Sequence, residues 1–177
     1  MNTDSKIIYR QIEQQRNQLI NELKILDKEC LYERLKEGGW NILEVLGHLL
    51  QTEKLALSYV KKKMNVVQKI KYSGIKAFLN KLLLLTVLFM PFRYKAPNNS
   101  IPEDHKTLEE LENEWAGVRK ELLGLLDETG NESQKLLYRH PFAGRMNLIQ
   151  MMQFFKAHIR HHIKQIYRIQ KGFKQKI

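Results

Sequence analysis

An apolar stripe with helical spacing runs through residues 147–171 and constrains the fold more than any other feature. Its members recur at intervals of three and four residues, which places them on one face of an α-helix. They are Leu148, Met151, Met152, Phe155, Ile159, Ile163 and Ile166. No proline or glycine interrupts the stretch. A helix of this length with one apolar face requires other elements to cover that face.

Apolar residues recur at the same intervals in three further stretches, and the resulting helices can pack against that apolar face. They span residues 4–27, 41–63 and 107–128. The expected starts of three helices have the form of a capping box: Asn41 with Glu44, Thr107 with Glu110, and Asn147 with Gln150. Residues 1–177 contain no convincing strand and no internal repeat, so we expect one domain with an all-α fold, a four-helix bundle.

Residues 64–105 interrupt the helical pattern and predict a long crossover between the second and third helices. Its apolar segment 78–92 contains Leu82–Met90, the most apolar run in the chain. Spanning a bilayer takes about 20 apolar residues, and Lys76 and Lys81 break the segment, so we expect no transmembrane helix. A packed or dimer-forming short helix, a lid on a pocket and an interfacial helix remain open as its role. No secretory signal is recognisable at the N-terminus, which favours the cytoplasm.

Charge is spread unevenly along a chain whose formal net charge is +11. Residues 54–102 and 133–177 each carry ten Lys or Arg and no acid. Ten of the nineteen acids lie between Glu103 and Glu132. The third helix is therefore acidic and its neighbours are basic, so part of the excess is expected to be neutralised internally. The remainder would attract anions such as acidic metabolites, phospholipid headgroups or nucleic acid.

Three of the six histidines lie in one five-residue segment, 158–162, of the expected C-terminal helix. His158 and His162 are one turn apart inside the apolar stripe, about 5–6 Å between Cβ atoms, whereas His161 is rotated about 100° away. His48 faces the core from the second helix, one turn beyond Glu44. Two interpretations remain open: core histidines with hydrogen-bonded rings, or ligands of one metal ion.

The metal interpretation favours a catalytic site. Three neutral imidazoles leave a coordination position open, whereas a structural zinc is usually enclosed by four ligands. The single cysteine, Cys30, excludes a cysteine cluster. Imidazole binds Zn, Ni, Fe, Cu and Mn, so the metal is not specified. Metal-bound histidine usually donates its other N–H to a carboxylate or carbonyl. The C-terminal helix contains no acid, so Glu44, Glu53 or the acidic helix would have to supply a carboxylate.

Three motifs together resemble the DinB/YfiT-like superfamily of four-helix bundles, in its DinB-like domain branch. They are Trp40-Asn-Ile-Leu-Glu-Val-Leu-Gly-His48-Leu, His140-Pro-Phe-Ala-Gly144 and His158-Ile-Arg-His161-His162-Ile-Lys-Gln165-Ile. The resemblance implies an up-down-down-up topology with the long crossover between helices two and three. It also implies homodimers and a three-histidine site for a divalent metal, carried here by His48, His158 and His162. Members of the superfamily are linked to thiol-dependent transferase or isomerase chemistry, and others resemble hydrolases.

Two more residues of these motifs have alternative roles. His140 would reach the pocket rim or form a structural hydrogen bond in its turn. Gln165 would steady the turn of helix that carries the histidines or lie exposed at the surface.

The sequence is compatible with two classes of function. A metal-dependent enzyme, of the thiol transferase or hydrolase kind, would act on a small substrate, either an anion or a low-molecular-weight thiol. A non-catalytic metal-binding or interaction bundle would keep the histidines without a reaction. A basic stripe on the C-terminal helix would attract nucleic acid or a membrane surface, but no aromatic platform or recognition motif accompanies it. The stripe comprises Lys156, Arg160, Lys164, Arg168 and Lys171.

Overall fold

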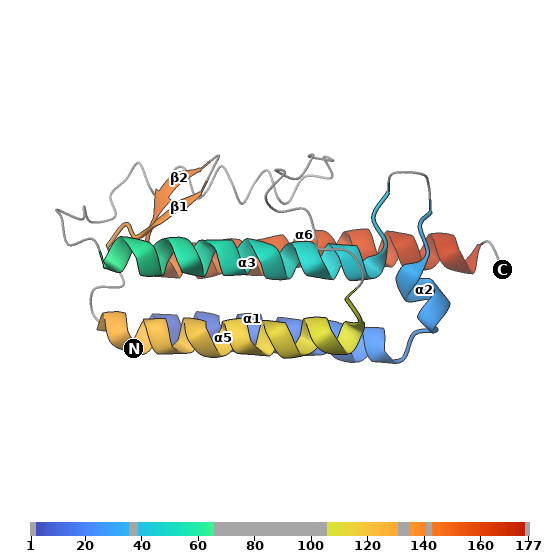
Figure 1. The fold of residues 1–177 in the computed structure, drawn as a ribbon, viewed down its shortest axis with the longest axis horizontal. Coiled ribbons are helices and arrows are strands. Elements are labelled where there is room, and N and C mark those ends of the chain that lie inside the picture. The colour runs from blue at the N-terminus through green and yellow to red at the C-terminus, as the bar shows by residue number, and fades with distance from the viewer. Residues whose placement is uncertain (1–2, 36–38, 66–105, 131–134, 141–142, 176–177) are drawn as a thin grey trace.

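A computed structural model describes residues 3–35, 39–65, 106–130, 135–140 and 143–175 (Figure 1). Its elements are α1 (Thr3–Lys24), α2 (Lys28–Tyr32), α3 (Ile42–Met64), α5 (Leu108–Thr129), β1 (Tyr138–His140), β2 (Gly144–Met146) and α6 (Leu148–Lys174). The predicted all-α fold is confirmed, and each expected helix is present with its ends shifted by a few residues. The short α2 and the two-stranded hairpin were not predicted.

The four long helices α1, α3, α5 and α6 lie side by side as a bundle (Figure 1). Lys54 contacts Glu114, and Lys61, two turns further along α3, contacts Glu121. Helices α3 and α5 are therefore parallel. Helices α1 and α6 are also parallel, because Lys156 donates a hydrogen bond to Gln11 and Tyr167 donates one to Glu22. The two pairs run in opposite directions (Figure 1).

The core of the bundle is built from the predicted apolar faces. Every member of the α6 stripe is buried except Ile163, which packs against the core from a half-buried position. The largest fully buried apolar side chains come from all four helices and include Ile12, Leu19, Leu46, Leu49, Trp115, Leu122 and Phe155. Burying one such side chain contributes about 1.5–3 kcal/mol. This packing fixes the rotation of each helix and therefore the direction of its polar residues.

All three predicted capping boxes are present, and they fix where the helices begin. Asn41, Thr107 and Asn147 each accept a hydrogen bond from the backbone N–H three residues on. In each case the side chain at that third position accepts a bond from the backbone N–H of the cap residue. These bonds satisfy N–H groups that have no partner within the helix.

The acidic helix α5 pairs with its basic neighbours, as the charge distribution predicted. Glu112 binds Lys24 of α1 at 2.7 Å, and Glu121 binds Lys61 of α3 at 2.8 Å. Glu114 binds Lys106 at 2.6 Å and also Lys54. Part of the net positive charge is thus neutralised between helices, although exposed pairs of this kind contribute only about 0–1 kcal/mol each.

A hairpin of β1 and β2 lies between α5 and α6, although the sequence showed no convincing strand. Tyr138 pairs with Met146, and His140 pairs with Gly144. Gly144 has φ 75°, a left-handed backbone conformation that favours glycine. Tyr138 and His140 are buried. The ring centroids of Tyr138 and Tyr59, on α3, are 6.3 Å apart. Strands of three residues are too short for a two-residue alternation to reveal them in the sequence.

The predicted crossover 64–105, with its apolar segment 78–92, lies outside the described residues except for Met64 and Asn65. Among the helices that the structure does describe, none combines the length and the apolar character needed to cross a bilayer.

Candidate metal centre

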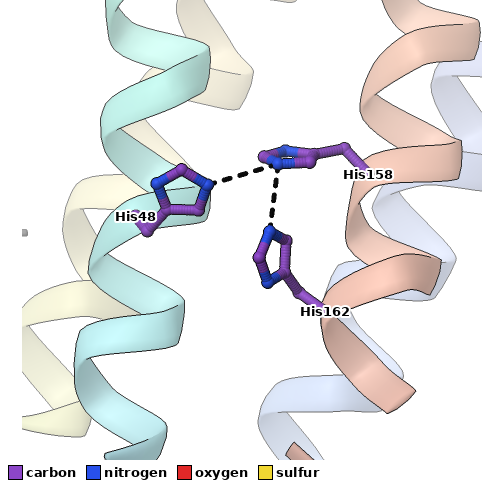
Figure 2. Close-up of side chains that lie close together, drawn as sticks. All are labelled: His48, His158 and His162. Atoms are coloured by element: carbon purple, nitrogen blue, oxygen red, sulfur yellow. Dashed lines mark hydrogen bonds between the residues drawn. The ribbon is translucent and has the colours of Figure 1, made fainter. Parts of the chain in front are cut away.

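Three histidines from two helices meet in the interior of the bundle. His48 lies on α3, two turns after the Asn41 cap, and His158 and His162 lie one turn apart on α6. Their rings point toward one another across the space between the two helices (Figure 2). The exposed fractions are 6%, 8% and 8%, respectively, so all three rings are buried. The sequence predicted this convergence, and the described residues contain it.

The ring nitrogens are spaced as ligands of one ion would be. The Nε2 atom of His158 is 3.3 Å from Nε2 of His48 and 3.1 Å from Nε2 of His162. One nitrogen from each residue lies within 4.8 Å of the other two. Two nitrogens bound at about 2.0–2.1 Å to one tetrahedral ion are separated by about 3.3–3.4 Å. The observed spacing is close to that value.

Gln165 fixes the tautomer of His162. Its Oε1 atom lies 2.8 Å from Nδ1 of His162, and an amide oxygen only accepts hydrogen bonds, so Nδ1–H donates. In the neutral ring, Nε2 then carries a lone pair aimed at the other two histidines. The amide carbonyl fills the role expected of a carboxylate, which explains how an acid-free helix can orient a ligand.

Burial favours the neutral form of the His158 and His162 rings. The pKa of His162 is lowered to about 3, first by burial and then by the neighbouring His48. The pKa of His158 is lowered well below its usual value by burial, and the two facing histidines add to this effect. Protons therefore compete weakly for these nitrogens near pH 7, and metal binding requires neutral imidazole.

The residues present fit a divalent cation. Three buried nitrogens converge. The Nε2 atom of His158 carries either one lone pair or one N–H, so it can form only one good hydrogen bond to the Nε2 atoms of His48 and His162. Hydrogen bonding within the trio is consequently incomplete, whereas one cation satisfies several lone pairs at once. Imidazole sets of this kind bind zinc and other transition metals.

Comparison with known proteins decides the family. The family model described as the DinB superfamily matches residues 11–166, which is most of the chain. The chain belongs to the DinB superfamily. A search of curated proteins found no match, and neither did a search of solved structures. The resemblance inferred from the three motifs is therefore confirmed.

Two aromatic rings flank the histidines of this DinB-superfamily chain. Phe154 stacks on His158 with ring centroids 5.2 Å apart and planes at 20°. Trp40, just before α3, lies against His48 at 5.0 Å. Phe154 is not a member of the apolar stripe predicted for α6, yet it is buried and packs against His158. Its position four residues before His158 is the sequence pattern that predicts this contact.

The remaining predicted residues lie around the trio without joining it. Glu44 accepts from Asn41 N–H at 2.7 Å and binds Arg34, so it caps α3. His140 accepts the Ala143 N–H at Nδ1, 3.1 Å, which is the structural bond considered for its turn, and burial lowers its pKa to about 4. His161 packs beside His162, with ring centroids 5.1 Å apart.

Glu53, another candidate carboxylate, belongs to a separate buried ion pair. Its Oε1 accepts from Arg119 at 2.7 Å and its Oε2 from the Trp115 indole at 2.9 Å. Glu53 is 2% exposed and Arg119 is 1% exposed. Burial raises the pKa of Glu53, and the bonds from Arg119 and Trp115 partly offset that rise. Arg119 was not singled out from the sequence, because an arginine on an amphipathic helix is usually exposed.

Proposed function

We propose that this DinB-superfamily protein binds one divalent metal ion through the Nε2 atoms of His48, His158 and His162, and that it is a metal-dependent enzyme of the thiol transferase or hydrolase kind. The observation that carries the proposal is the meeting of three buried imidazole nitrogens from α3 and α6. Three protein ligands leave a position for a small molecule, which is the pattern of catalytic sites.

The protein's own residues would prepare that position. Burial favours the neutral form of His158 and His162, and Gln165 orients the ring of His162. Phe154 stacks on the face of His158 and Trp40 packs at a tilt against His48, so both aromatic rings reduce the contact of the histidines with water. A divalent ion held by these three histidines would lower the pKa of a coordinated water or thiol, and would thereby supply a nucleophile near neutral pH.

The substrate class follows from size and charge. A site enclosed between two helices favours a small molecule, and the net charge of +11 favours an anion. A low-molecular-weight thiol that carries carboxylates satisfies both conditions. The shared direction of α3 and α5, with a long crossover between them, supports the up-down-down-up topology of the resemblance.

Activity assays of untagged, metal-loaded protein test the catalytic proposal. We expect either transfer of a low-molecular-weight thiol to an electrophile or hydrolysis of a small ester or amide. Chelation should abolish that activity, and so should His48→Ala, which removes the ligand supplied by α3. Protein that binds metal but performs neither reaction would contradict catalysis and leave a non-catalytic metal-binding bundle.

Gln165→Ala should lower the affinity for divalent metal by about 10–100-fold, because outer residues that orient a ligand contribute this much. His162 would lose the acceptor that holds its Nδ1–H and its ring direction. Competition with a chromophoric chelator measures the change. Gln165→Glu retains an acceptor and should bind more tightly than Gln165→Ala. Gln170→Ala, on the same helix, is the matched control, and equal losses in both alanine variants would contradict the role of Gln165.

A further inference from the structure

The hairpin of β1 and β2 contacts both of the helices that supply the three histidines. It directly precedes α6, and β1 packs against α3 (Figure 1). Tyr138 and His140 are buried, whereas Arg139 between them is exposed, so both rings lie on the inward face of β1. Tyr138 packs against Tyr59 of α3. His140 packs against Phe154 of α6, with ring centroids 4.7 Å apart. The hairpin therefore bridges α3 and α6.

A stack of three buried rings connects the hairpin to the histidine trio. The ring stack comprises His140, Phe154 and His158. His140 meets Phe154 at 72°, and Phe154 lies nearly parallel to His158, at 20° and 5.2 Å between centroids. The three residues are 7%, 3% and 8% exposed, respectively. Because the interior is close-packed, Phe154 cannot move away from His158 unless His140 also moves.

The ring direction of His158 depends on this packing. Within the described residues, both hydrogen-bond contacts of His158 are at Nε2, which faces His48 and His162. His162 differs, because Gln165 also holds its Nδ1 atom. A metal ligand needs some contact that orients its ring. For His158, the flat face of Phe154 supplies that contact.

The backbone of the hairpin fixes His140, the outer ring of the stack. Its Nδ1 atom accepts the Ala143 N–H at 3.1 Å, and the residue pairs with Gly144 across the two strands. Gly144 has φ 75°, so the turn needs a residue without a side chain at this position. A change in the hairpin backbone would therefore move His140 and release Phe154.

We propose that the hairpin positions the metal ligand His158 through the ring stack. The inference rests on the proposed metal centre and adds the element that sets the direction of one ligand. His140 and Phe154 are positioning residues, not ligands. Coupling of this kind is reciprocal, so metal binding stabilises the hairpin by the same factor that the hairpin contributes to metal affinity. One aromatic pair accounts for about 2–10-fold in an equilibrium constant.

Hydrogen exchange of untagged wild-type protein, with and without one equivalent of zinc, tests the coupling without any substitution. Zinc should slow the exchange of the backbone amides of β1 and β2 by about 2–10-fold. The amides of the short helix α2, which is not part of the ring stack, are the comparison and should slow less. In His158→Ala, zinc should no longer slow the hairpin amides. Equal slowing of α2 and the hairpin, or none in either, would overturn the inference.

The variant Phe154→Leu tests the orientation of the ligand itself. It keeps an apolar side chain but removes the flat face against His158, so zinc affinity should fall by about 2–10-fold. The visible absorption of bound cobalt(II), which depends on ligand geometry, should change as well. Phe155→Leu is the matched control, because it removes the same buried ring from the next position of α6. Equal effects of the two variants on affinity and spectrum would contradict the role of Phe154.

The pair His140→Ala and Arg139→Ala tests the hairpin end of the stack. His140→Ala leaves both α6 rings in place but removes the ring behind Phe154, so it should change the cobalt spectrum in the same direction as Phe154→Leu. Arg139→Ala alters the exposed side of the same strand and should leave the spectrum unchanged. Suppose that His158→Ala abolishes zinc binding but neither His140→Ala nor Phe154→Leu changes the cobalt spectrum. The metal centre would then stand, and the positioning role of the hairpin would be refuted.

Discussion

His158→Ala should reduce the affinity for divalent metal by more than about 100-fold, a larger loss than is expected for an outer residue such as Gln165. His158 is central to the trio, because its Nε2 is 3.3 Å from that of His48 and 3.1 Å from that of His162. Without it, two nitrogens from different helices remain, and no third ligand from the described residues replaces it. Competition titration against a chromophoric chelator gives both the affinity and the stoichiometry.

The control for His158→Ala is His161→Ala on the same helix. His161 is half-buried and lies outside the trio, so its removal should change metal affinity less than about threefold. Circular dichroism and thermal unfolding of both metal-free variants establish that the bundle is still folded. If the two substitutions have equal effects on metal affinity in folded protein, the ion binds elsewhere.

Arg119→Met should destabilise the protein by about 3–5 kcal/mol, because it leaves the buried Glu53 carboxylate without its cation. The carboxylate would keep only its bond from the Trp115 indole among the contacts described here. Nη1 of Arg119 has no hydrogen-bond partner within the described chain, and Nε lies 3.6 Å from Oε1 of Glu13, an ion pair too long for a hydrogen bond. The pair is therefore imperfectly satisfied, and its complete removal should cost much less than breaking it. Urea unfolding with a common m-value measures both changes.

The double variant Arg119→Met with Glu53→Leu separates these two effects. Apolar residues of similar volume often replace a buried ion pair at no cost, so the double variant should recover most of the stability lost by Arg119→Met. Lys61→Met is the exposed comparison, because it breaks the surface pair with Glu121 and should cost less than about 1 kcal/mol. A small loss for Arg119→Met, similar to that for Lys61→Met, would refute the importance of the buried pair.

The helices and the histidine trio were accessible from sequence because both depend on local periodicity. The spacing of His158 and His162 within the apolar stripe established their direction, and the Asn41 cap established that of His48 on its own helix. The contact between α3 and α6 then follows from the packing of their apolar faces against each other. The capping boxes fixed the helix starts, so the rotation of each histidine could be predicted before any tertiary contact was known.

Contacts between elements distant in sequence were harder to predict. Glu53 was a candidate partner for a histidine and Arg119 resembled a surface residue of an amphipathic helix. Only their packing reveals that they neutralise each other in the core. The hairpin and α2 were too short for a periodic pattern. The bond from His162 to Gln165 depends on which rotamers the packed helix allows, so the sequence left exposure of Gln165 as an equal alternative.

X-ray absorption spectroscopy at the metal edge, on untagged protein loaded with one equivalent of zinc, tests the three-histidine site most directly. We expect three imidazole nitrogens at about 2.0–2.1 Å from the ion, plus one oxygen or nitrogen ligand at the open position. His48→Ala should remove one imidazole from the first shell. A spectrum without imidazole scattering, or one unchanged by His48→Ala, would contradict the proposal that α3 and α6 together hold the metal.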